Sequence, residues 1–278
     1  MNTAELLKML FSTSFTVYAL IGGIAVALCA ALLGVSLVLK RYSMIGDGLS
    51  HVGFGVMAVA MTVGVAPLAL SIPTVIIAAI FLLRISERGI GGDAAIALIS
   101  SSALAIGVIV ISLGGGMNVD ISDYMFGSSI LTLTKGDVII SIVLAAVVIM
   151  LYIIMHNRIF AITFDEKFAT ATGNRSGLYN MIIAVLTAVT IVIGMRMIGA
   201  LLISSLIIFP PLTAMRVCRS YRSVEICSVI VAAVCVVVGM LVSFVLSIPT
   251  GAAIVVTNLC VFIIFLAVSF IVRRIVRR

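Results

Sequence analysis

The stretch Arg41-Tyr42-Ser43-Met44-Ile45-Gly46-Asp47-Gly48-Leu49-Ser50-His51 places two ionisable side chains inside an apolar segment of the chain. Asp47 is the only one of the ten acidic residues that we place within such a segment, and His51 is one of only two histidines. The two are four residues apart, so on an α-helix their side chains lie on one face, one turn apart. A carboxylate and an imidazole in this arrangement can bind a small divalent cation between them.

The depth of this pair in a membrane follows from helix geometry. If the membrane boundary lies near Arg41, ten residues at about 1.5 Å each place His51 roughly 15 Å deep. That is close to the middle of a hydrocarbon core about 30 Å thick. An ionisable side chain there costs about 2.5–3.5 kcal/mol and normally faces a pathway or a partner. The alternative is a helix-packing hydrogen bond from Asp47 to a serine or backbone group, with His51 uninvolved.

The composition indicates a membrane protein. Hydrophobic residues make up 63% of the chain and charged residues 10%, and the mean hydropathy is +1.40. Because nearly all of the length lies in apolar runs, we expect residues 1–278 to form one polytopic transmembrane domain, with no nucleotide-binding, kinase or receptor module. The net charge of +7 could indicate a nucleic-acid partner, but the basic residues are spread over short loops. Membrane topology explains that distribution better, and we expect no nucleic-acid partner.

The hydrophobic runs predict an all-α bundle of about nine membrane-spanning helices, with eight as the alternative number. Many of the runs contain Gly, Ala and Ser, which allow helices to approach closely in lipid. The predicted spans are Phe11–Leu39, Ser43–Ala66, Leu68–Leu83, Ala94–Leu113, Gly136–Met155, Tyr179–Gly194, Met197–Met215, Val224–Leu246 and Thr250–Val272.

The basic residues predict the orientation of this bundle. Loops after the first, third, fifth, seventh and ninth spans hold all but three of the 17 Lys and Arg residues, and the other side holds only Lys8, Lys135 and Arg196. The positive-inside rule therefore predicts an N-terminus outside and a C-terminus in the cytosol. The basic residues on the predicted cytosolic side are Lys40, Arg41, Arg84, Arg88, Arg158, Lys167, Arg175, Arg216, Arg219, Arg222, Arg273, Arg274, Arg277 and Arg278.

Two of the predicted cytosolic loops are long enough to contact a partner, although either could be only a solvated linker. Residues 156–177 predict a short surface helix that stops at Gly173-Asn174. Residues 210–223 begin with Pro210-Pro211, which we expect to break the helix and turn the chain along the membrane face. In this second loop three basic residues recur every third position and would form one basic helical face. They are Arg216, Arg219 and Arg222.

The opposite side of the predicted bundle holds one loop with two carboxylates and two tight turns. Asp120 and Asp123 follow a run of three glycines and could attract cations to a pore, or could simply be solvated. We expect one tight turn at residues 194–196 and another at residues 247–251.

Four blocks of the sequence, in order, resemble the ABC-3 family, the permeases of bacterial ABC importers for zinc and manganese. The first is the stretch that ends in Gly46-Asp47-Gly48-Leu49-Ser50-His51, which is the most specific of them. The others are Tyr124-Met125-Phe126-Gly127-Ser128, then Ile198-Gly199-Ala200-Leu201-Leu202 with Ile208-Phe209-Pro210, then Ile248-Pro249-Thr250-Gly251. The resemblance covers essentially the whole chain.

This resemblance implies a subunit of the bacterial inner membrane that carries no resident cofactor and is not itself an enzyme. Two copies would form the translocation path, cytosolic ABC ATPase subunits would drive it, and an extracytoplasmic metal-binding protein would deliver the ion. Asp47 and His51 match the metal-coordinating pair of the family. The stretch after the third block corresponds to the ATPase-coupling region, which favours residues 210–223. Its residues here are Pro210, Pro211, Arg216, Arg219 and Arg222.

Two departures from the family pattern bear on the identity of the metal. Many manganese-type members follow the histidine with small residues and Leu-Pro-Gly, whereas this chain has Val52-Gly53-Phe54-Gly55-Val56. Some members carry an acidic residue where this chain has Ser247. We therefore favour zinc slightly, with manganese or iron open. One Asp and one His are too few for a tight site, so waters, a second subunit or hydroxyls such as Ser50 would complete it.

Other functions remain as alternatives. A permease for metal chelates such as siderophores or cobalamin would share the helical architecture but would not need Asp47 with His51. An intramembrane metalloprotease is a more distant alternative, because it needs a pattern such as His-Glu-x-x-His and no Glu neighbours either histidine at that spacing. A purely structural scaffold leaves the cost of burying Asp47 without an explanation.

Overall fold

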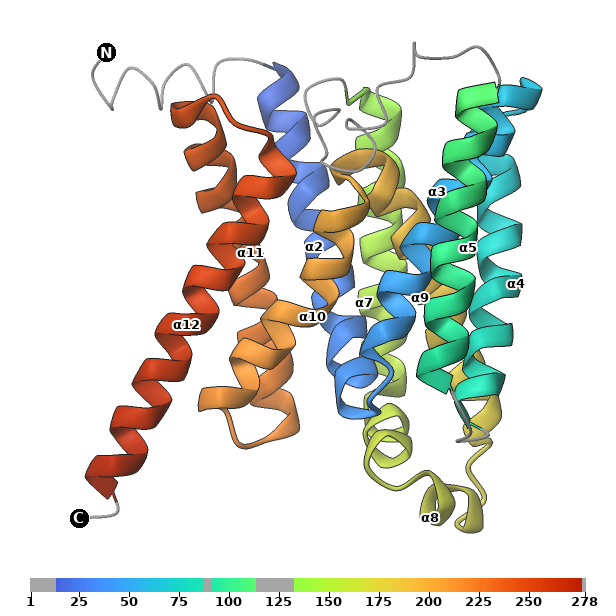
Figure 1. The fold of residues 1–278 in the computed structure, drawn as a ribbon. Helices are drawn as coiled ribbons and strands as arrows, with labels where there is room; N and C mark the ends of the chain where they lie inside the picture. The colour runs from blue at the N-terminus through green and yellow to red at the C-terminus, as the bar shows by residue number, and fades with distance from the viewer. Residues whose placement is uncertain (1–13, 88–91, 114–132, 277–278) are drawn as a thin grey trace.

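The computed structural model describes residues 14–87, 92–113 and 133–276, and every regular element in these ranges is a helix (Figure 1). Nine of the helices are long and apolar enough to cross a membrane, which confirms the all-α fold and the predicted number of spans. The exception is the six-residue helix α8. The helices are α2 (Ser14–Leu39), α3 (Ser43–Val63), α4 (Pro67–Glu87), α5 (Gly92–Leu113), α7 (Lys135–Phe164), α8 (Glu166–Ala171), α9 (Ser176–Ile198), α10 (Ala200–Val217), α11 (Tyr221–Leu246) and α12 (Thr250–Val276).

The helices are arranged around α2. It packs against α7, α9, α10 and α11, while α3, α4 and α5 form a group at one side and α12 leans outward at the other (Figure 1). The short helix α8 and the end of α12 lie at the same end of the bundle, which is called the α8 end below (Figure 1). The basic residues predict that this end is cytosolic.

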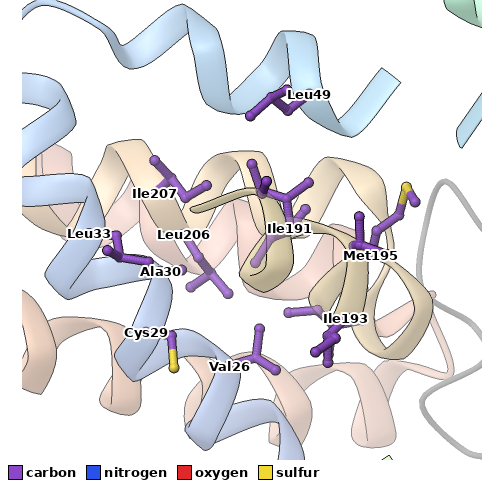
Figure 2. Packing of buried hydrophobic residues seen from close by; sticks show 14 of the residues in the cluster. Val26, Cys29, Ala30, Leu33, Leu49, Ile191, Ile193, Met195, Leu206 and Ile207 are labelled. Atoms are coloured by element: carbon purple, nitrogen blue, oxygen red, sulfur yellow. The ribbon is translucent and has the colours of Figure 1, made fainter. Parts of the chain in front are cut away.

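The core is built where α2, α9 and α10 meet. Figure 2 shows Val26 and Leu33 of α2 close to Ile191 of α9 and Leu206 of α10. Each of these four side chains is at most 1% exposed. Because lipid is as apolar as these side chains, close packing rather than exclusion of water holds the helices together.

The double proline does not end a helix, so the prediction that it does is wrong. Pro210 and Pro211 lie inside α10 and are buried. Pro211 cannot donate a hydrogen bond to the carbonyl of Ile207 one turn earlier. At that oxygen α2 presents Gly34, where a Cβ atom would lie only 2.1 Å away. The freed carbonyl therefore lies against the backbone of α2 at Gly34.

A second difference concerns the turn between α9 and α10. We predicted it at residues 194–196, but α9 continues to Ile198 and the chain turns at Gly199 alone. Gly199 has φ 91° and ψ 154°, a conformation available essentially to glycine only. The predicted turn at residues 247–251 is confirmed, since α11 ends at Leu246 and α12 begins at Thr250.

Helix α7 is longer than its apolar run. It begins at a capping box formed by Thr134 and Asp137 and continues past the predicted end at Met155 to Phe164. The apolar run is interrupted by the polar residues His156-Asn157-Arg158, but the backbone hydrogen bonds of the helix continue. The short surface helix and its stop are confirmed, as α8 is followed by Gly173 with φ 90°.

Candidate functional site

Asp47 and His51 lie side by side on α3, as their spacing predicts. The Nε2 atom of His51 is 3.7 Å from Oδ2 of Asp47. The side chain of Asp47 is 41% exposed and that of His51 is 19% exposed, although both sit on a membrane-spanning helix. An exposed carboxylate at membrane depth is costly against lipid, so this face of α3 must meet water or another protein chain.

Ser50 is not turned to the same face. Its side chain is 1% exposed, and its hydroxyl donates a hydrogen bond of 2.7 Å to the backbone carbonyl of Asp47. The same hydroxyl lies 3.1 Å from that of Ser204 on α10. Ser50 thus joins α3 to α10 and is occupied by contacts of its own.

The glycines around the pair allow other helices to approach α3 closely. A Cβ atom at Gly48 would lie 2.8 Å from a methyl carbon of Ile96 on α5. A Cβ atom at Gly55 would lie 2.5 Å from the carbonyl oxygen of Ala103 on the same helix. Because α5 fits against this glycine face, Asp47 and His51 are held on a helix that is fixed in rotation.

The pair is incomplete as a metal site within one chain. Among the residues that the structure describes, no group of three or more His, Cys, Asp or Glu side chains could hold a metal ion. A cation bound by Asp47 and His51 therefore needs further ligands. Asp120, Asp123 and the block Tyr124–Ser128 lie outside the described residues.

The residues predicted to contact an ATPase are separated by the fold. Pro210 and Pro211 are buried in α10. Arg216 lies in the last turn of the same helix, with its guanidinium carbon 5.6 Å from the ring centre of Phe262. Arg219 lies in the turn after α10 and Arg222 in the first turn of α11, so the expected single basic helical face does not form.

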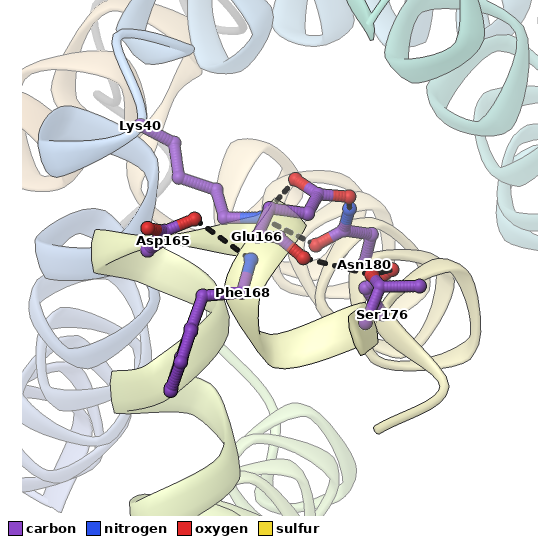
Figure 3. Close-up of polar contacts among 7 residues, drawn as sticks. Lys40, Asp165, Glu166, Phe168, Ser176 and Asn180 are labelled. Atoms are coloured by element: carbon purple, nitrogen blue, oxygen red, sulfur yellow. Dashed lines mark hydrogen bonds and ion pairs between the residues drawn. The ribbon is translucent and has the colours of Figure 1, made fainter. Parts of the chain in front are cut away.

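The other predicted loop forms a braced element. Figure 3 shows Glu166 at the start of α8 between Lys40 and Asn180. The Nζ atom of Lys40 donates to Oε2 of Glu166 over 3.2 Å and to Oδ1 of Asn180 over 2.5 Å, and Asn180 donates to Oε1 of Glu166 over 2.8 Å. Asp165 caps α8 by accepting from the backbone N–H of Phe168. These bonds fix α8 to α9 and to the corner between α2 and α3.

The sequence interpretation missed a polar cluster between α7 and α11. Nδ1 of His156 is 3.2 Å from Oε2 of Glu225, which is 7% exposed and lies one turn into α11. Asp47 is therefore not the only acidic residue within an apolar segment. The hydroxyls of Tyr152, Tyr221 and Ser36 form a buried triangle beside this pair. The position of Glu225 just inside a predicted span was the signal available.

Comparison with known proteins places the chain in a family. The family model for the ABC 3 transport family matches residues 12–269, nearly the whole chain. The chain belongs to the ABC 3 transport family. It is thus a multi-pass membrane protein of a transport family, as the resemblance of its four sequence blocks implied.

Proteins named for metal transport are similar to this chain over most of their length. The high-affinity zinc uptake system membrane protein ZnuB of Haemophilus influenzae is 28% identical over 249 residues, which cover 89% of this chain and 95% of that one. The manganese import system permease protein ScaB of Streptococcus gordonii is 27% identical over 261 residues, 94% and 93% of the two chains. The solved structure of PsaBC from Streptococcus pneumoniae in complex with Fab superposes with a TM-score of 0.84 at 29% identity, covering 95% of each chain.

Proposed function

We propose that this chain is the membrane-spanning permease subunit of an ATP-driven importer of a divalent transition-metal ion. Relatives named for zinc uptake and for manganese import support metal as the cargo. Zinc is slightly preferred over manganese and iron, because the proline-containing pattern of many manganese-type members is missing after His51. Imidazole and carboxylate ligands suit all three metals. The ion is cargo, and no resident cofactor is proposed.

The observation that carries the proposal is the exposed Asp47–His51 pair on a membrane-spanning helix. A carboxylate that is 41% exposed at that depth is stable only beside water, a cation or a partner chain. With the imidazole nitrogen 3.7 Å away, the two side chains can each donate a lone pair to one ion. Ser50 is assigned a different role, which is to hold the turn of α3 that carries them.

A site with two ligands per chain suits a pathway. An ion in transit must bind well enough to enter and weakly enough to leave. A second copy of the chain, which would present its own Asp47 and His51, or water molecules would complete the coordination. An extracytoplasmic metal-binding protein would deliver the ion to this pathway.

We propose that the cytosolic ATPase docks on α8 rather than on residues 210–223. Helix α8 projects at the predicted cytosolic end, and its Phe168 side chain is 65% exposed (Figure 1). A large exposed aromatic on a braced helix is typical of a protein contact. By contrast, Pro210 and Pro211 are buried, and Arg216 is held against Phe262. The chain has no Gly-x-x-x-x-Gly-Lys-Ser/Thr loop to bind ATP phosphates, so hydrolysis is assigned to that partner.

The proposal is tested by uptake of radioactive zinc and manganese into cells that carry each variant. His51→Ala removes a nitrogen ligand, and Asp47→Asn removes the charge that offsets the cation while keeping the size of the side chain. Both variants should reduce uptake by at least about ten-fold, because the loss of a ligand or of its charge lowers the metal affinity of a site by about this factor or more. Uptake is normalised to the amount of permease in the membrane.

Asp137→Asn is the matched control. Asp137 is also acidic and lies on a spanning helix, but it forms an ion pair of 3.4 Å with Arg196 at the end opposite α8. Metal uptake by cells with Asp137→Asn should stay near that of cells with the native chain. Normal uptake by His51→Ala would remove the central assignment, and a loss of folded Asp47→Asn protein would favour a packing role for Asp47.

A further inference from the structure

A groove runs between α7 and α11. Both helices pack on α2, and they contact each other through side chains near the α8 end, where His156 of α7 meets Arg222 and Glu225 of α11. The space left between them measures about 510 Å³. Leu32 of α2 lines it together with aliphatic side chains of the two flanking helices, among them Ile149, Ile153, Val229 and Ile230. Such a space can hold a hydrocarbon chain.

The groove continues toward the α8 end into a polar part. A second space of about 490 Å³ shares three lining residues with the first, namely His156, Asn157 and Arg222. Arg219 and Ser220 from the turn between α10 and α11 line it as well, together with the rings of Phe160, Phe164 and Tyr221. One continuous groove is therefore aliphatic at one end and carries two arginines at the other.

One acidic side chain, that of Glu225, also lines the groove. Nε of Arg222 donates to Nε2 of His156 over 3.2 Å, so this imidazole nitrogen is an acceptor and the ring proton sits on Nδ1. Nδ1 is 3.2 Å from Oε2 of Glu225, whose side chain is buried. Glu225 thus faces the imidazole through Oε2. Within the described chain, the terminal nitrogens of Arg222 make no hydrogen bond, and both Arg222 and Arg219 are exposed.

The polar part lies at the height of lipid headgroups. His156 is 21 residues after Lys135, the first residue of α7. At about 1.5 Å per residue this distance is roughly 32 Å, about the thickness of the hydrocarbon core. Arg222 is the second residue of α11 and lies at the same end. A phosphate at the membrane surface would therefore lie beside Arg222 and Arg219, with the apolar groove extending from it into the membrane.

We propose that this groove binds one anionic phospholipid of the leaflet at the α8 end. Its phosphate would accept hydrogen bonds from the free guanidinium nitrogens of Arg222 and from Arg219, an arrangement in which arginine binds phosphate well. One acyl chain would lie along the aliphatic wall toward Val229. An anionic headgroup is favoured over a zwitterionic one, because a choline or ethanolamine cation would be brought against the arginines.

The test is native mass spectrometry of the detergent-purified chain titrated with phosphatidylglycerol or with phosphatidylcholine. The native chain should retain one phosphatidylglycerol with at least about ten-fold preference, the scale of one charge-assisted hydrogen bond. The double variant Arg219→Gln/Arg222→Gln should lose that preference. Val229→Trp fills the apolar part while leaving both arginines in place, and it should also weaken binding.

Arg216→Gln is the matched control, since Arg216 lies at the same end of the bundle but has its guanidinium over Phe262 and does not line the groove. It should retain the preference. Equal retention of the two lipids by the native chain overturns the proposal, as does unchanged preference in the double variant. Equal binding of glycerol 3-phosphate alone would also overturn it, because the apolar groove would then contribute nothing. A photo-crosslinker at Ile153 should label lipid; labelling of a second copy would reassign the groove to a protein interface.

Discussion

At the scale of single residues, Ser50 and His51 are adjacent in sequence, but we expect their substitution to affect different properties. Substitution of Ser50 should lower stability, whereas substitution of His51 should lower metal uptake. Ser50→Ala removes a buried hydroxyl that binds the Asp47 carbonyl and contacts Ser204. We expect it to lower the free energy of unfolding by about 0.5–1.5 kcal/mol and to leave most of the metal uptake. Thermal unfolding in detergent and uptake in cells are measured on the same variant. Lost uptake with unchanged stability would make Ser50 a ligand instead.

The same residues mark how far the sequence predicts the site. Asp47 and His51 share a face because they are four residues apart, which helix geometry alone determines. The orientation of Ser50 depends on Ser204, which is 154 residues away and cannot be paired with it from local pattern. The contact of His156 with Glu225 is hidden for the same reason, because it joins two helices that are distant in sequence.

At the scale of helices, the contact of α2 with the proline-containing part of α10 predicts a sharp difference between two glycines. A Cβ atom at Gly34 would lie 2.1 Å from the Ile207 carbonyl oxygen, a backbone atom that cannot move alone. Gly34→Ala should therefore destabilise the fold by about 1–3 kcal/mol, the usual cost of overpacking. Gly23→Ala on the same helix is the control, as its nearest contact would be 3.4 Å from a methyl of Val236. Equal thermal unfolding of the two variants in detergent would contradict this account.

Hydropathy predicts that the nine spans exist but not where their helices end. Lipid contact determines which residues are apolar, and each span must hide its backbone whatever its sequence. Helix ends depend instead on caps and neighbours. Pro210 and Pro211 would break an isolated helix, yet α10 continues to Val217, with Gly34 of α2 packed against the Ile207 carbonyl. That packing is a property of two helices together, so the sequence of α10 could not reveal it.

At the scale of the whole molecule, one buried charge connects the proposed ATPase contact with the proposed metal pathway. Lys40 follows α2 directly, its side chain is 9% exposed, and it pairs with Glu166 of α8 over 3.2 Å. Three residues after Lys40, α3 begins and carries Asp47 and His51. A displacement of α8 by a docked ATPase would therefore act on the corner from which the metal-binding helix starts.

Lys40→Met keeps most of the length of the side chain and removes the charge, so α8 should lose its connection to α3 without losing its own surface. We expect the ATPase still to co-purify with this variant while metal uptake falls about five-fold or more, the usual scale of coupling between sites. Phe168→Asp, by contrast, should abolish co-purification of the ATPase, because a charge replaces the exposed ring. Combining Lys40→Met with Glu166→Gln should be no worse than the more damaging single change, because the two residues share one interaction. Fully additive losses of uptake would show that Lys40 and Glu166 act separately and would remove this link between α8 and the pathway.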